Sequence, residues 1–112
     1  MADSEPSKIK RLAQQIRKQP DDSFSKFALA LEFRKQGELK KARILFEDIL
    51  ENDPEYVGIY YHLGKLYELL ERPKDALKLY KTGISITEKQ NESRTQSELK
   101  EAVAQLEIEL EE

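Results

Sequence analysis

The sequence predicts an all-α fold, a superhelix of about six helices that pair into hairpins. Apolar residues recur at the three- and four-residue spacing of a helix face, and no segment alternates with period two for long enough to indicate a strand. Five positions also reappear 34 residues further along, matched in size and polarity. The pairs are Leu29 and Leu63, Phe33 and Tyr67, Ala42 and Ala76, Phe46 and Tyr80, and Leu50 and Ile84. Such a period is typical of a solenoid, in which each unit buries its apolar face against the next.

Helix-starting and helix-ending residues divide the chain into six segments. Pro6 suits a first helical turn, because the amide that proline lacks has no helical partner there. Asp21 or Asp22 offers the next N-cap, and Gly37 tolerates the left-handed conformation that commonly follows a helix. The expected helices cover about 6–18, 23–36, 38 to the break at 52, 54–70, 73–89 and 96–111.

Capping residues predict two further helix starts. Asp53 is expected to cap the fourth helix, with Pro54 at its first helical position. Segment 95–98 matches a capping box, in which the Thr95 hydroxyl and the Glu98 carboxylate satisfy each other's free amides. The fourth and sixth helices are therefore expected to begin at these signals.

The last predicted helix carries an apolar seam in an acidic segment. Seven acidic and two basic residues lie between Asn91 and Glu112, which leaves this part of the chain at −5. The seam consists of Leu99, Val103, Leu106 and Leu110. We interpret it as the face of a capping helix that packs on the fifth helix. The alternative is a dimerisation seam or a swapped helix.

Composition excludes several classes of function. The 112 residues suit one small domain, and the net charge of −3 argues against nonspecific nucleic-acid binding. The chain has no cysteine, which excludes disulfides and thiol chemistry. No stretch has the roughly 20 apolar residues of a membrane span, and the polar start lacks the apolar core of a signal peptide. We therefore expect a cytoplasmic protein that binds no nucleic acid and no membrane.

The second unit of the repeat resembles a known family. It reads Tyr60-x-x-Leu63-Gly64-x-x-Tyr67, followed by Ala76-x-x-x-Tyr80. This pattern resembles the tetratricopeptide repeat, and the resemblance covers about residues 21–90. It implies one domain over 1–112, with a capping helix at 6–18, repeats at 21–54 and 55–90, and a second capping helix at 95–111.

Repeat positions with small side chains indicate where helices cross. Gly64 and Ala30 are small where the two helices of a hairpin meet, so the backbones can approach closely. Ala42 and Ala76 do the same from the second helix of each hairpin. Lys26 departs from the pattern, because it stands where the second unit has an aromatic residue.

The resemblance also implies a concave surface lined by the first helix of each hairpin. The residues placed there by position are Phe24, Phe27, Leu31, Arg34, Tyr61, His62, Lys65 and Glu68. Phe27 and Leu31 lie outside the repeat's own core set, and an apolar strip of this kind commonly marks an interaction site. The alternative is that the first or last helix of this chain already covers the strip.

Known chemistry finds little support in the sequence. Phe27, Leu31 and His62 occupy positions that a chaperone-binding subset of the family fills with the Lys and Asn of a carboxylate clamp, so that mechanism is not expected. His62 is the only histidine, and it is either a groove contact or a structural or solvated ring. No catalytic constellation, cofactor loop or metal site is predicted.

Two hypotheses follow from the sequence. The leading one is a non-enzymatic adaptor that binds a peptide or helix of a partner protein in the concave groove. The alternative is a self-assembly module, in which the terminal helices or the groove pair two copies as a weak homodimer.

Overall fold

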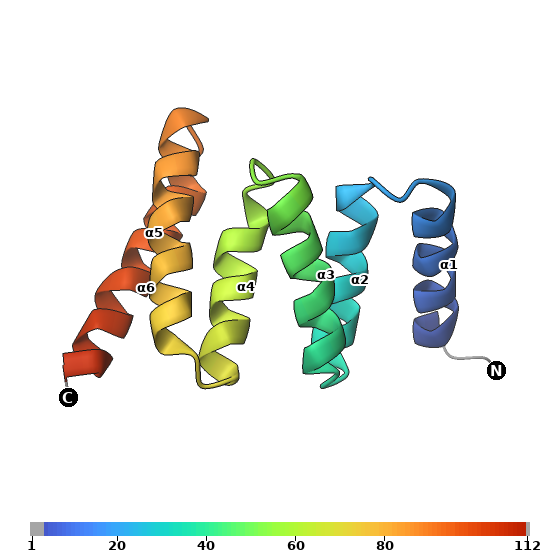
Figure 1. Cartoon of the computed structure of the whole chain (residues 1–112), viewed down its shortest axis with the longest axis horizontal. Helices are drawn as coiled ribbons and strands as arrows, with labels where there is room; N and C mark the ends of the chain where they lie inside the picture. Colours follow the sequence, from blue (N-terminus) through green and yellow to red (C-terminus); the bar gives the residue numbers. More distant parts are fainter. Residues whose placement is uncertain (1–3, 112) are drawn as a thin grey trace. The chain divides into compact units, whose positions relative to one another are not determined.

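The computed structural model describes residues 4–111, and the side chains of residues 8–111. Six helices and no strand occur within residues 4–111, which confirms the all-α prediction (Figure 1). They are α1 (Ser4–Lys18), α2 (Ser23–Lys35), α3 (Leu39–Asn52), α4 (Gly58–Leu69), α5 (Pro73–Lys89) and α6 (Ser93–Glu111). The polar start at residues 1–3 lies outside the described residues.

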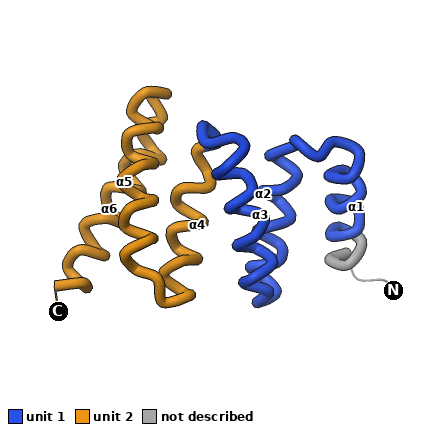
Figure 2. The backbone as a smooth tube through the Cα atoms, viewed as in Figure 1, with its two compact units in different colours: residues 1–56 blue, residues 57–112 orange. Residues whose placement is uncertain are grey.

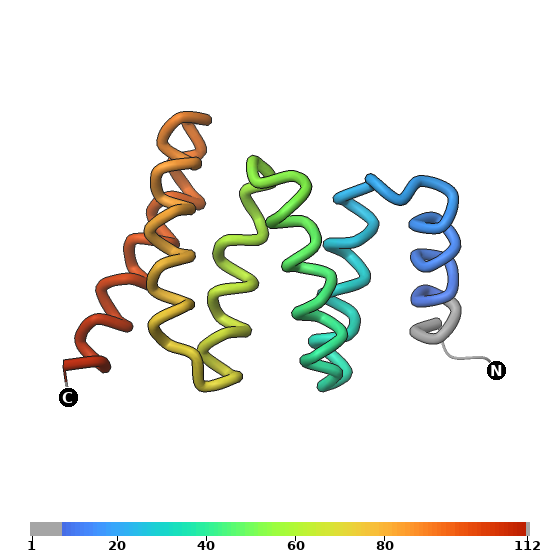
Figure 3. The backbone as a smooth tube through the Cα atoms, in the orientation of Figure 1, coloured from blue at the N-terminus to red at the C-terminus, as the bar shows by residue number. Residues whose placement is uncertain are grey.

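The chain divides into two compact units of three helices each. Unit 1 spans residues 1–56 and unit 2 spans residues 57–112 (Figure 2). In unit 1, α1 packs on α2, and α2 pairs with α3. In unit 2, α4 pairs with α5, and α6 packs on α5 and more narrowly on α4. The chain reverses direction between α2 and α3 and again between α4 and α5, which makes each pair a hairpin (Figure 3).

Three helices end with the same left-handed residue. Gly37 has a φ of 81°, as predicted from its missing Cβ, and Glu71 and Asn91 have φ values of 59° and 58° after α4 and α5. In each case the next amide reaches back to a carbonyl of the last turn. The donors and acceptors are Glu38 to Phe33, Arg72 to Tyr67, and Glu92 to Thr87.

The prediction that α4 begins at Pro54 is wrong. The helix begins at Gly58, because the chain first forms a turn in which the Tyr56 amide donates to the Asp53 carbonyl at 3.0 Å. The Asp53 side chain does not cap α4 either. It accepts a hydrogen bond of 2.7 Å from the Ser23 hydroxyl, so a contact within unit 1 overrides the local capping signal.

The predicted capping box of α6 is also wrong. The helix begins at Ser93, and Thr95 lies inside its first turn. The reason is the short connection from α5, where Asn91 reverses the chain and the Glu92 carbonyl already accepts the Gln96 amide at 2.9 Å. The helical hydrogen bonds therefore start before the Thr95 hydroxyl can act as a cap.

Unit 2 has a close helix crossing where the sequence predicted one. A Cβ built on Gly64 of α4 would lie 2.1 Å from Cε1 of Tyr80 on α5, so only glycine fits. A Cβ on Gly83 would lie 2.5 Å from Cβ of Tyr60 and 2.9 Å from Cδ1 of Leu99. Two glycines thus let α4 and α6 approach α5.

The seam of α6 faces α5 only in part. Leu99 and Leu106 are buried, Val103 is half-buried, and Leu110 remains 42% exposed. Ala102 shares the buried face. Packing of α6 on α5 is what we expected of a capping helix.

Candidate partner-binding site

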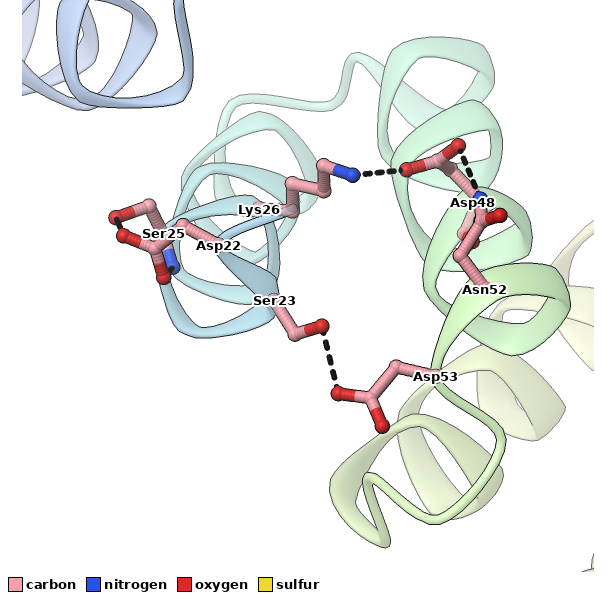
Figure 4. A network of polar contacts seen from close by, with 7 residues as sticks. All are labelled: Asp22, Ser23, Ser25, Lys26, Asp48, Asn52 and Asp53. Atoms are coloured by element: carbon pink, nitrogen blue, oxygen red, sulfur yellow. Dashed lines mark hydrogen bonds and ion pairs between the residues drawn. The ribbon is translucent and has the colours of Figure 1, made fainter. Parts of the chain in front are cut away.

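The start of α2 is fixed by side-chain hydrogen bonds. Asp22 is the N-cap, and its carboxylate accepts from the Ser25 amide at 3.1 Å and from the Ser25 hydroxyl at 2.8 Å (Figure 4). These bonds to Ser25 stabilise the charged carboxylate and lower the pKa of Asp22. Ser23 holds Asp53 of the following loop. The beginning of α2 is therefore tied to itself and to the end of α3.

Lys26 replaces the expected aromatic residue with an ion pair. Its Nζ lies 2.6 Å from Oδ2 of Asp48 on α3, and only 11% of the lysine side chain is exposed (Figure 4). Asp48 also accepts from the Asn52 amide at 3.0 Å. In unit 2 the corresponding position is Tyr60, which is buried by packing. The departure from the repeat pattern thus has a local structural reason.

One side of α2 is buried, and the opposite side carries the predicted site residues. The buried residues are Ser25, Lys26, Leu29, Ala30 and Glu32. With 3.6 residues per turn, the opposite side presents four residues that we call the outer face of α2. They are Phe24, Phe27, Leu31 and Arg34.

The outer face of α2 is apolar along most of its length. Phe24 is 70% exposed, and Phe27 and Leu31 are half-buried. Helix α1 makes its ion pair with α2 elsewhere, between Lys8 Nζ and Glu32 Oε2 at 3.0 Å. Glu32 lies on the buried side of α2, so α1 leaves Phe24 uncovered.

Tyr56 joins this face, and sequence reasoning missed it. Its ring centroid lies 5.3 Å from that of Phe27, whose other neighbour is Phe46 at 5.7 Å. Burial, with the charges of Asp53 and Asp22, raises the pKa of Tyr56. The expected helix over 54–70 hid this role, because the structure places Tyr56 in a turn against α2 instead.

Arg34 stands at the far end of the outer face. Its Nε is buried and has no hydrogen-bond partner among the described residues. A buried donor without an acceptor is costly, and it is uncommon in folded proteins. Arg34 is therefore the one polar member of this face, and its donor is unsatisfied.

The predicted residues of unit 2 lie along α4 and contact one another. Lys65 Nζ lies 5.5 Å above the Tyr61 ring centroid and 3.8 Å from Glu68 Oε2. The Tyr61 and His62 rings meet edge to face at 5.6 Å. We call Tyr61, His62, Lys65 and Glu68 the outer face of α4. It is polar, and its members already have partners.

Glu68 is also tied to the core of unit 2. Its Oε2 accepts a hydrogen bond of 2.5 Å from the Tyr80 hydroxyl. Burial, together with this bond to Glu68, raises the pKa of Tyr80. Glu68 therefore serves the α4–α5 hairpin as well as the outer face.

The described residues offer contact surfaces and no recognisable reaction centre. Within residues 4–111, no three His, Cys, Asp or Glu side chains gather closely enough to hold a metal ion. No helix in that range is both long and apolar enough to cross a bilayer. The chemistry available on the two outer faces is apolar contact, aromatic stacking and charge.

Helical hairpins in tandem, with small residues at their crossings, define this chain as a helical-repeat protein. A family model described as tetratricopeptide repeat matches residues 33–106. The chain belongs to the tetratricopeptide-repeat family. Domains of this family generally mediate protein–protein interactions, and they are typically not enzymes.

Several known proteins are similar to this chain. A tetratricopeptide repeat domain protein from Salinibacter ruber, solved by NMR, is 44% identical with a TM-score of 0.75, covering 79% of this chain and 89% of that one. A TPR repeat-containing protein of Methanocaldococcus jannaschii is 39% identical over 70 residues. That match takes in 62% of this chain but only 22% of the relative's length.

A more distant neighbour shows the fold alone. The TPR2B domain of yeast Sti1, solved in its pHsp70 complex, has a TM-score of 0.85. The comparison covers 95% of this chain and 85% of that one, at 16% identity.

Proposed function

We propose that this chain is a non-enzymatic adaptor that binds an apolar peptide or helix of a partner protein on the outer face of α2. The single observation that carries this proposal is that α2 has apolar side chains on both its buried and its outer side. A surface helix normally turns polar residues outward. Here Phe24 is 70% exposed, beside half-buried Phe27 and Leu31.

The outer face of α4 complements this proposal. Tyr61, His62, Lys65 and Glu68 would supply polar contacts, because their side chains carry donors, acceptors and an aromatic ring that a partner can reach in part. The cytoplasmic location and the absence of cofactors, nucleic acid and membrane stay predictions from composition.

The energetics of the outer face of α2 fit a recognition site. Fully burying a Phe or Leu side chain contributes about 1.5–3 kcal/mol. Part of that gain is still available to a partner at Phe24 and Leu31, because both remain partly in contact with water in this chain. Two such residues can therefore account for the strongest contacts of a small interface.

A peptide selection tests the proposed site. A random 15-residue library displayed on phage would be selected on the purified chain, and a recovered peptide would be measured by fluorescence anisotropy. We expect Phe24→Ala combined with Leu31→Ala to weaken binding by about 30-fold or more, because the two truncated side chains bury less apolar surface against the peptide. Helical circular dichroism should be unchanged.

Ile44→Ala is the matched control. Ile44 is 59% exposed on α3, outside the outer face of α2, and its truncation removes a similar apolar surface. Binding should be unaffected in this variant. Recovered peptides that bind the double variant as well as the original chain would contradict the proposed site.

Self-assembly is the alternative function, and α6 supplies the observation that favours it. Ile108 is 61% exposed and Leu110 is 42% exposed near the end of this helix. Pairing of two copies through these residues would cover them. Sedimentation equilibrium over a wide concentration range decides the matter, because a strict monomer at high concentration contradicts self-assembly.

A further inference from the structure

The same repeat position is used differently in the two units. Arg34 and Glu68 are 34 residues apart and both end an outer face. Glu68 accepts the Tyr80 hydroxyl and lies 3.8 Å from Lys65. Arg34 makes no ion pair within residues 8–111, and its Nε is buried without an acceptor.

The packing of unit 1 explains why Arg34 is left over. The position that corresponds to Tyr80 is Phe46, which has no hydroxyl to place near residue 34. Phe46 is fully buried and contacts Phe27, so the hairpin packs without help from Arg34. The fold of unit 1 therefore does not use the guanidinium.

We propose that Arg34 binds a carboxylate of the partner segment, so that the partner is an apolar peptide or helix with an acidic residue at the end over the C-terminus of α2. This inference rests on the proposed function of the outer face. A carboxylate can accept from Nε and a terminal nitrogen of arginine together, which would satisfy the orphan donor.

Charge at the other end of α2 fixes the direction of the partner. Asp21 and Asp22 precede the helix, and Asp53 is hydrogen-bonded to its first residue. An acidic group on the partner is therefore repelled at the N-terminal end and attracted at the Arg34 end. Phe24 and Arg34 are ten residues apart, or about 15 Å along the helix.

The spacing defines the partner more closely. A helical partner needs an apolar residue over Phe24 and an acidic residue about ten positions away. An extended partner needs only about four or five residues for the same distance. In both cases the acidic residue lies to one side of the apolar contacts and not among them.

The experiment repeats the phage selection on the Arg34→Gln variant and compares the recovered sequences. We expect peptides selected on the original chain to carry Asp or Glu at one end of an apolar pattern, and peptides selected on Arg34→Gln to lack that preference. In anisotropy, replacing the acidic residue by Gln should weaken binding to the original chain about fivefold and leave binding to Arg34→Gln unchanged.

Lys35→Gln is the control for general electrostatics, because it removes the same charge one residue further along, from an exposed side chain. This variant should keep the acidic preference. The inference is overturned if the acidic residue contributes equally with Arg34→Gln, if Lys35→Gln abolishes the preference as fully, or if the selected peptides show no acidic end.

The two proposals fail in different ways. Peptides that depend on Phe24 and Leu31 but show no acidic preference would leave the proposed site intact and remove the role of Arg34. Recovery of no peptide that depends on Phe24 and Leu31 would remove both. Circular dichroism melting of each variant verifies that the fold is retained.

Discussion

The outer faces of α2 and α4 occupy equivalent repeat positions and have opposite character. On α2 the residues are Phe24, Phe27, Leu31 and Arg34, and on α4 they are Gly58, Tyr61, Lys65 and Glu68. The last three of the α4 residues contact one another, and one of them supports the hairpin. The α2 residues expose an apolar surface and an unsatisfied donor. Equivalent positions thus serve stability in one unit and are available for binding in the other.

The difference extends into the hairpin crossings. Unit 2 combines Gly64, Tyr80 and Glu68, whereas unit 1 combines Ala30, Phe46 and Arg34. Glycine makes room for the tyrosine ring, and glutamate accepts its hydroxyl. Phenylalanine carries no hydroxyl, so unit 1 needs no acceptor at position 34. The three residues of each set therefore form one packing solution.

Gly64→Leu should cause the largest effect. A Cβ at this position already falls 2.1 Å from the Tyr80 ring, so the variant should lose about 3 kcal/mol or more of unfolding free energy by overpacking. The reverse change in unit 1, Ala30→Gly, should cost only about 1 kcal/mol through helix propensity. Denaturant titration followed by circular dichroism measures both. Equal stability of Gly64→Leu and the original chain would disprove the close crossing.

Much of this crossing could be predicted from the sequence. The repeat marks the packed positions, because a fixed offset with matched size has a packing reason at each site. Segment 73–89 also matches α5 residue for residue, since proline and the breaker before it act locally. The starts of α4 and α6 could not be predicted, because Tyr56 packs on Phe27 and Asn91 reverses the chain early.

The candidate site was only partly readable. The helical period and the family resemblance place Phe24, Phe27, Leu31 and Arg34 on one face, and the structure agrees. Tyr56 escaped notice because its contact joins a turn to a helix 29 residues earlier. The orphan state of Arg34 depends on burial, which spacing does not reveal, although the missing hydroxyl at position 46 gave a hint.

Tyr80→Phe tests the second half of the comparison. It makes the core of unit 2 like that of unit 1 at this position, and it leaves Glu68 without the bond at 2.5 Å. We expect a loss of about 1–3 kcal/mol near neutral pH, because a partly buried acceptor loses its donor. Glu68→Gln, which can still accept the hydroxyl, should lose less. A Tyr80→Phe chain as stable as the original would show that the bond contributes nothing.

The same variant should change the response to alkaline pH. The pKa of Tyr80 is raised above its ordinary value of 10.0 in the folded chain, by burial first. Above pH 10 the unfolded tyrosine ionises while the folded one does not, so stability is present below that pH and is lost as the pH rises beyond it. Tyr80→Phe should lose less stability than the original chain between pH 10 and pH 11. Parallel curves for the two chains would contradict the assignment.

Phe24→Ala should have the smallest effect on stability and so sharpens the contrast between the two outer faces. Phe24 is 70% exposed, and a surface substitution of this kind usually changes the free energy of unfolding by less than about 0.5 kcal/mol. Tyr61→Ala removes ring contacts with Lys65 and His62, so it should cost about 1 kcal/mol. If thermal unfolding instead shows Phe24→Ala to be the more damaging variant, the outer face of α2 supports the fold, and its apolar surface needs no partner to explain it.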